Sequence, residues 1–67
     1  MKIILNNNKE TFDESGITVD HLLKIKNYTF KMLIIKINGI LIPKGAYETT
    51  TIHEGDDVSV LHLISGG

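Results

Sequence analysis

The sequence predicts an α+β domain in which one short helix packs across a mixed sheet of four to five strands. Segments 1–6, 32–43 and 58–64 are rich in β-branched and other aliphatic residues, as strands are. Segment 18–27 instead has apolar residues at the three- and four-residue spacing of a helix. A chain of 67 residues is the size of one small domain, so these elements must share one core.

The N-terminal segment predicts a β-hairpin. In MKIILN, the period of two places Ile3 and Leu5 on one face of a strand and Lys2 and Ile4 on the other. NNNK is a turn signal, because asparagine tolerates left-handed backbone. ETFD then reads as a short return strand with Phe12 toward the core. We expect an irregular connection between the two strands.

The helix has a start signal and an end signal. Thr18 is a suitable N-cap, and Lys26 falls where the apolar stripe should continue, so the helix is expected to end near Asn27. The stripe itself consists of Val19, Leu22 and Leu23.

The second half of the chain predicts two further strands joined tightly and a separate last strand. Asn38-Gly39 in IKINGILIP is a strong signal for a two-residue hairpin turn. Pro43 cannot donate to a ladder, so the strand before it is short and lies at an edge or ends there. HEGDD is a turn built on Gly55, and the last strand follows it.

Two strands are apolar on both faces. If Val58 and Val60 point inward, then Leu61 and Leu63 point outward, and Ile34 does the same in LIIKI, where Ile35 and Ile37 point inward. A fully buried strand is one explanation. A single helix leaves one sheet face uncovered, so we favour an exposed apolar patch, which is typical of an interaction surface.

Composition excludes several classes of function. The chain has no cysteine, so it has neither a disulfide framework nor a thiolate zinc site. A net charge of −1, with all seven cations lysine, argues against general nucleic-acid binding. No apolar run approaches the roughly 20 residues of a membrane span, and the N-terminal segment is too short for a signal peptide, so we expect a cytoplasmic protein without a membrane partner.

The residues offer little to an enzyme or a metal. No nucleophile-elbow, zinc-protease or P-loop pattern occurs. The acidic cluster of residues 54–57 is more simply a solvated turn. The histidines lack ligand-like spacing, so we expect no metal site at His21, His53 or His62.

The chain ends on Ser65, Gly66 and Gly67. Two terminal glycines arise by chance at roughly 0.5%, taking glycine usage at about 7% per position. A cloning scar or a truncation can produce the same letters. The alternative is that the terminal carboxylate, with an ordinary pKa of about 3.5, is the reactive group, presented on a slim tail that fits a narrow channel.

The ordered set of MKIILNNN, TVDHLL, IKINGILIP and HEGDDVSVLHLISGG resembles the ThiS family of bacterial sulfur carriers, in the ThiS/MoaD group of β-grasp (ubiquitin-like) proteins. The resemblance covers the whole chain. It implies a β-grasp domain over 1–64 and a flexible tail over 65–67. The protein would be a substrate of other enzymes and not itself an enzyme.

The resemblance also implies the chemistry and the partners. Gly67 would be adenylated by a ThiF-like adenylyltransferase using ATP and magnesium, and the chain itself would bind no cofactor. The adenylate would become a thiocarboxylate, with sulfur from a cysteine desulfurase, and the thiazole synthase ThiG would accept that sulfur for thiamine. Gly66 and Ser65 would form the tail behind Gly67. A monomer is expected, with a partner-binding surface formed by Ile34, Lys36, Leu61 and Leu63.

Other functions remain open at this point. A small subunit of molybdopterin synthase, as in MoaD, has the same fold and thiocarboxylate chemistry, but those chains tend to be longer. A carrier for another sulfur product is a further alternative. A ubiquitin-like binding module with an incidental Gly-Gly end belongs to a different class, as does a modifier that forms isopeptide bonds.

Overall fold

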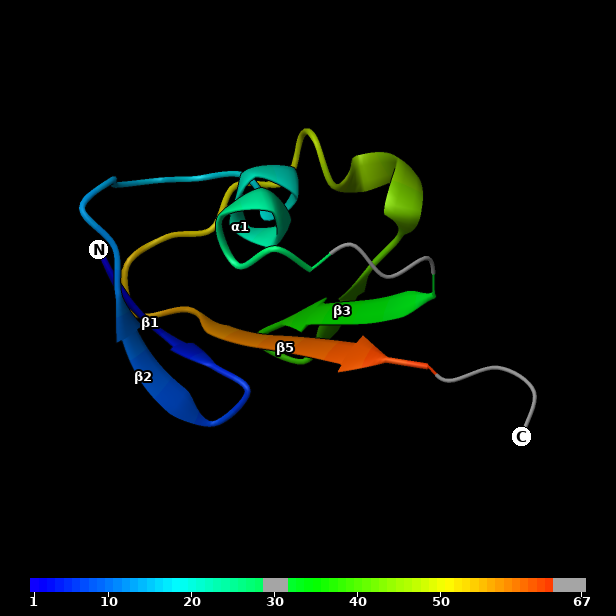
Figure 1. Cartoon of the computed structure of the whole chain (residues 1–67), viewed down its shortest axis with the longest axis horizontal. Coiled ribbons are helices and arrows are strands. Elements are labelled where there is room, and N and C mark those ends of the chain that lie inside the picture. Colours follow the sequence, from blue (N-terminus) through cyan, green and yellow to red (C-terminus); the bar gives the residue numbers. More distant parts are fainter. Residues whose placement is uncertain (29–31, 64–67) are drawn as a thin grey trace.

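The computed structural model describes residues 1–28 and 32–63, and these residues form a five-stranded mixed sheet with one α-helix on one face (Figure 1). The strand order is β2-β1-β5-β3-β4, with β1 and β5 parallel and the other neighbours antiparallel. This confirms the predicted fold class. The elements are β1 (Lys2–Leu5), β2 (Asn8–Thr11), α1 (Val19–Ile25), β3 (Leu33–Ile37), β4 (Ile40–Ile42), the 3₁₀ helix η1 (Lys44–Ala46) and β5 (Asp57–His62).

The connection between β1 and β2 differs from the prediction. It is a two-residue turn, Asn6-Asn7, with φ of 51° and 68°, and Leu5 pairs directly with Asn8. The expectation of an irregular connection was therefore wrong, and the return strand begins at Asn8, ahead of the predicted ETFD segment. Tight hairpin turns of this kind need positive φ at both central residues, and asparagine accepts it at lower cost than other side chains.

Helix α1 has the predicted ends. The Thr18 hydroxyl accepts a hydrogen bond from the His21 backbone N–H at 3.1 Å, which caps the first turn. Asn27 follows the helix with φ of 58°, the left-handed conformation common just past a helix end. The Lys26 ammonium lies 3.0 Å from the Glu10 carboxylate on β2. The lysine that interrupts the apolar stripe therefore forms an ion pair between the end of the helix and the sheet.

The core lies between α1 and the sheet. Three positions of α1 and alternate positions of β1, β3 and β5 supply most of it. Phe12, Ile17 and Ile52 complete it from outside these elements, and the Ile52 backbone N–H donates to the Ile17 carbonyl at 2.7 Å. The core residues are Ile3, Leu5, Phe12, Ile17, Val19, Leu22, Leu23, Ile35, Ile37, Ile52 and Val58.

The β3–β4 hairpin is held to the start of β5 by one side chain. Asn38 and Gly39 form the predicted turn, with φ of 51° and 82°. The Asn38 side-chain amide donates to the Asp56 carboxylate at 3.0 Å, and its oxygen accepts the Asp57 backbone N–H at 2.9 Å. These bonds fix the end of the hairpin against the Gly55 turn, so β3 and β5 run side by side from this point.

Candidate functional site

The candidate site is the sheet face that α1 does not cover, which we name the outer face. On the central strands, Ile35 and Val58 are fully buried toward the helix, so the alternating residues point the other way. The register pairs Ile34 with Leu61 and Lys36 with Ser59. Cross-strand partners lie on the same face, so the strands place Ile34, Leu61 and Lys36 together on the outer face.

The predicted surface residues are exposed to different degrees. The side chains of Leu61 and Leu63 are 53% and 39% exposed, whereas Ile34 is half-buried and Lys36 is exposed. Leu63 follows β5, and its backbone N–H donates to the Met32 carbonyl at 2.9 Å, which extends the pairing beyond the strand. The four predicted residues therefore lie on or beside two neighbouring strands.

Two further apolar residues on the outer face were not predicted. Leu41 on β4 is 59% exposed and pairs with Lys36, and Ile4 on β1 is 39% exposed. A sequence signal existed for both. A two-residue turn at Asn38-Gly39 places residue 41 opposite residue 36, and the period of two already placed Ile4 on the outward face of its strand.

The outer face thus combines apolar side chains with an unpaired cation. Within residues 1–28 and 32–63, Lys36 makes no ion pair, while Leu41 and Ile34 lie beside it on neighbouring positions. Exposed large hydrophobic residues gathered on one face are typical of interaction surfaces. The arrangement is suited to binding a protein.

The predicted reactive end lies outside the described residues. Ser65, Gly66 and Gly67 belong to the segment 64–67, which the structure does not describe. Strand β5 is the last described element, and its C-terminal end lies on the opposite side of the molecule from the N-terminus (Figure 1).

The acidic turn and the histidines have structural partners. Asp56 accepts the His53 backbone N–H at 2.8 Å, and Glu54 accepts the Lys2 backbone N–H at 3.0 Å, so these carboxylates hold the turn before β5. His21 lies 3.1 Å from Glu14. Among the described residues no group of three or more His, Cys, Asp or Glu side chains is placed to hold a metal ion. No helix in this part of the chain is both long and apolar enough to cross a membrane.

Comparison with known proteins identifies the family. The model of the ThiS family matches residues 2–67, which is nearly the whole chain. The chain belongs to the ThiS family. ThiS proteins are small sulfur carriers of thiamine biosynthesis, not enzymes, and they carry no cofactor.

Solved structures agree with the ThiS assignment. The chain is similar to the crystal structure of the thiamine biosynthesis protein ThiS from Geobacter metallireducens, with a TM-score of 0.87 and 28% identity over 100% of both chains. It is also similar to the solution structure of a thiamine biosynthesis protein from the same organism, with a TM-score of 0.80 and 26% identity over 100% of this chain and 88% of the other. No curated protein sequence matches the chain.

Proposed function

We propose that this ThiS-family chain carries sulfur as a thiocarboxylate on Gly67 and delivers it to a thiazole synthase. The observation that carries the proposal is the family match, which extends to residue 67 and so includes the Gly-Gly end. The structure supports it indirectly, because the described residues include an exposed apolar face that can contact a partner protein. Gly66 and Ser65 act as the slim tail behind the reactive residue.

The chemistry requires an activating partner. The Gly67 carboxylate is ionised at neutral pH and is a poor acyl donor. An adenylyltransferase of the ThiF type, using ATP and magnesium, joins it to AMP and releases pyrophosphate. The outer sulfur of a cysteine desulfurase persulfide then displaces AMP to form an acyl disulfide. A second thiol, such as that of free cysteine, reduces this bond, which releases the thiocarboxylate and leaves a disulfide on the sulfur donor. Because adenylation consumes ATP, we place the carrier in the cytoplasm, where it acts as a monomer.

The outer face is the proposed docking surface for these partners. Ile34, Leu61 and Leu63 supply the apolar contact, and Lys36 supplies a charge that an acidic group on the partner can neutralise. Docking through the face supplies binding energy that offsets the entropy lost when a tail is ordered in an active site. Leu41 extends the same surface onto β4.

The proposal is tested by intact-mass analysis. The chain is incubated with ATP, magnesium, cysteine, a cysteine desulfurase and a ThiF-like enzyme that is active on its own carrier. Exchange of one oxygen for sulfur at the C-terminus is expected. The matched control lacks Gly67 and should remain unmodified while it still binds the enzyme. No mass change in the intact chain would refute the proposal.

The sulfur acceptor is tested separately. The thiocarboxylated chain is divided between thiazole synthase with its substrates and the large subunit of molybdopterin synthase with its precursor. The ThiS family match favours loss of sulfur in the first reaction. Transfer in the second reaction only would show that the chain supplies sulfur for molybdopterin and not for thiamine. The proposal that Gly67 carries the sulfur would still stand.

A further inference from the structure

The β2 edge of the sheet is open. Met1 and Phe12 exchange both backbone hydrogen bonds, at 2.7 and 2.8 Å, so the next bonded pairs in this antiparallel ladder are Ile3 with Glu10 and Leu5 with Asn8. Lys9 and Thr11 fall between these pairs. Their backbone N–H and C=O groups therefore point away from β1, toward the free side of the sheet.

The opposite edge of the sheet, β4, offers few free backbone groups to an added strand. Ile37 and Ile40 flank the two-residue turn and form a bonded pair, so Leu41 alone of the three β4 residues directs its backbone groups outward. Pro43 follows the strand and has no N–H to offer. An added strand thus finds a longer backbone template on β2 than on β4.

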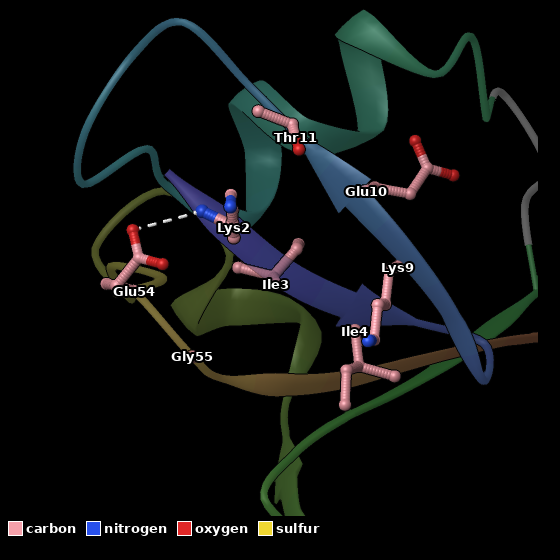
Figure 2. A pocket seen from close by; sticks show the side chains of 8 residues that line it. All are labelled: Lys2, Ile3, Ile4, Lys9, Glu10, Thr11, Glu54 and Gly55. Carbon is pink, nitrogen blue, oxygen red and sulfur yellow. Dashed lines mark hydrogen bonds between the residues drawn. The ribbon is translucent and has the colours of Figure 1, made fainter.

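A groove lies beside β2 on the outer face (Figure 2). It encloses about 410 Å³ and is lined by the β1–β2 hairpin and the turn before β5. Ile4 forms an apolar part of the groove's lining, and Lys9 is the cross-strand partner of Ile4. Lys2 and Thr11 form the next cross-strand pair on the same face of the hairpin. There the Glu54 carboxylate accepts the Lys2 backbone N–H.

The lysines at this groove have no carboxylate partner within the described chain, because none lies within ion-pair distance of Lys2 or Lys9. The two lysines at the C-terminal end of α1 are paired. Lys24 lies 3.1 Å from Asp20, and the Lys26 ammonium lies 3.0 Å from the Glu10 carboxylate. Glu10 and Glu54 also line the groove, but Glu10 is paired with Lys26 and Glu54 accepts the Lys2 backbone N–H. Lys2 and Lys9 are therefore the charged side chains of the groove that are available to an anionic ligand.

We propose that the β2 edge and this groove bind an extended, acidic segment of a partner protein, which adds to the sheet as a sixth strand. Backbone bonds to Lys9 and Thr11 would hold the segment. Its acidic side chains would alternate onto the outer face beside Lys9, with apolar side chains between them. A second copy of this chain is disfavoured as the occupant, because pairing of β2 with β2 about a two-fold axis at Lys9 or Glu10 would place like charges opposite each other.

This site is separate from the proposed sulfur chemistry. Lys2 lies beside the N-terminus, and the C-terminal end of β5 lies on the other side of the molecule (Figure 1). A partner bound at β2 would leave the outer-face residues of β3 and β5 free. One partner can then hold the carrier at β2 while it engages those residues, which raises the effective concentration of the second contact.

The test is an amide NMR titration of the whole chain, labelled with ¹⁵N, with a blocked hexapeptide of alternating Glu and Val. The control peptide has Lys in place of Glu. At up to about 1 mM acidic peptide, a ligand range suited to weak binding, the Lys9 and Thr11 amide signals should shift and saturate, and exchange of both amides with water should slow. The cationic peptide should leave them unchanged.

Variants separate charge from backbone pairing. The double substitution Lys2→Glu and Lys9→Glu should weaken binding at least about tenfold, because it removes two attractions and adds two repulsions. Lys44→Glu makes the same kind of charge change on exposed η1 and should leave binding within about twofold. Thr11→Pro deletes an N–H that points to the open edge, so it should weaken the acidic peptide while the remaining spectrum stays folded.

Five results would overturn the proposal, and the first four concern the peptides and variants. These are an absence of shifts at Lys9 and Thr11, equal binding of the cationic peptide, unchanged affinity of the double variant, and shifts that centre on Leu41. Self-association of the chain through β2, detected as concentration-dependent signal broadening at Lys9, would also overturn it by identifying a second copy as the occupant. None of these measurements depends on sulfur transfer.

Discussion

Leu61→Ala should weaken binding of the activating enzyme without unfolding the carrier. Leu61 points to the outer face, opposite Ile34, and its side chain is 53% exposed. Slightly less than half of the side chain is therefore buried within the domain. Complete burial of a leucine stabilises by about 1.5–3 kcal/mol, so truncation should cost the free energy of unfolding less than about 1.5 kcal/mol.

The effect on binding follows from the exposed part. If docking buries the 53% of Leu61 that solvent now reaches, the side chain contributes about 0.8–1.6 kcal/mol to association. At 1.4 kcal/mol per factor of ten, the dissociation constant should rise by about 4- to 15-fold. This range is an upper estimate, because alanine retains part of the apolar contact.

The assay is calorimetric titration of the adenylyltransferase with each carrier, together with KM for the carrier in the thiocarboxylation reaction. Ile40→Ala is the matched control. Ile40 is 67% exposed, but it pairs with the buried Ile37 and so lies on the helix side of the sheet, at its edge. The dissociation constant and the KM should both rise for Leu61→Ala and stay within about twofold of wild type for Ile40→Ala. Equal effects of the two variants, or none for Leu61→Ala, would refute the assignment of the outer face.

Three further predictions concern the fold. Ile35→Ala should lower the free energy of unfolding by about 2–5 kcal/mol in urea titration, because Ile35 is fully buried between α1 and the sheet, and a smaller loss would contradict that packing. Thr18→Ala should cost about 0.5–2 kcal/mol by the same measurement, since it removes the bond to the His21 N–H, whereas Thr18→Ser should retain most of the stability. The hydrogen bond to Glu10 raises the pKa of Lys26 above its ordinary 10.5, so the pair stabilises the fold below pH 10.5 and loses this contribution as pH rises through the raised pKa. The difference in free energy of unfolding between wild type and Lys26→Met should shrink as pH rises through the raised pKa of Lys26. A difference that stays constant would exclude the pairing.

Signals confined to a few neighbouring residues were predicted correctly. The Thr18 cap, the end of the helix near Asn27 and the Asn38-Gly39 turn each depend on one to three neighbouring residues. The first hairpin shows the limit of this reasoning. The segment NNNK predicted a turn but did not identify the two asparagines at its centre. In the structure Leu5 pairs with Asn8, so Asn6 and Asn7 form the turn.

The outer face was partly predictable. Alternation in LIIKI and VSVLHLI identified Ile34, Leu61 and Leu63 as outward-facing, and all three have solvent exposure in the structure. Leu41 follows from the local Asn38-Gly39 turn, which pairs it with Lys36, whereas Ile4 joins them only because the strand order places β1 beside β5. That order results from packing between segments far apart in the chain, and residue spacing does not contain it.

The sequence alone determined the helix, the Asn38-Gly39 turn, the alternation of the strands and the Gly-Gly end, since each is encoded within a few consecutive residues. The tertiary structure decided which strands became edges, which lysines found carboxylate partners and which apolar residues gathered on one face. Lys26 is paired because β2 brings Glu10 beside the end of α1, whereas Lys2 and Lys9 find no carboxylate within the described chain. The physical reason is that a side chain's electrostatic and apolar neighbours are set by long-range packing, while backbone conformation responds first to local chemistry.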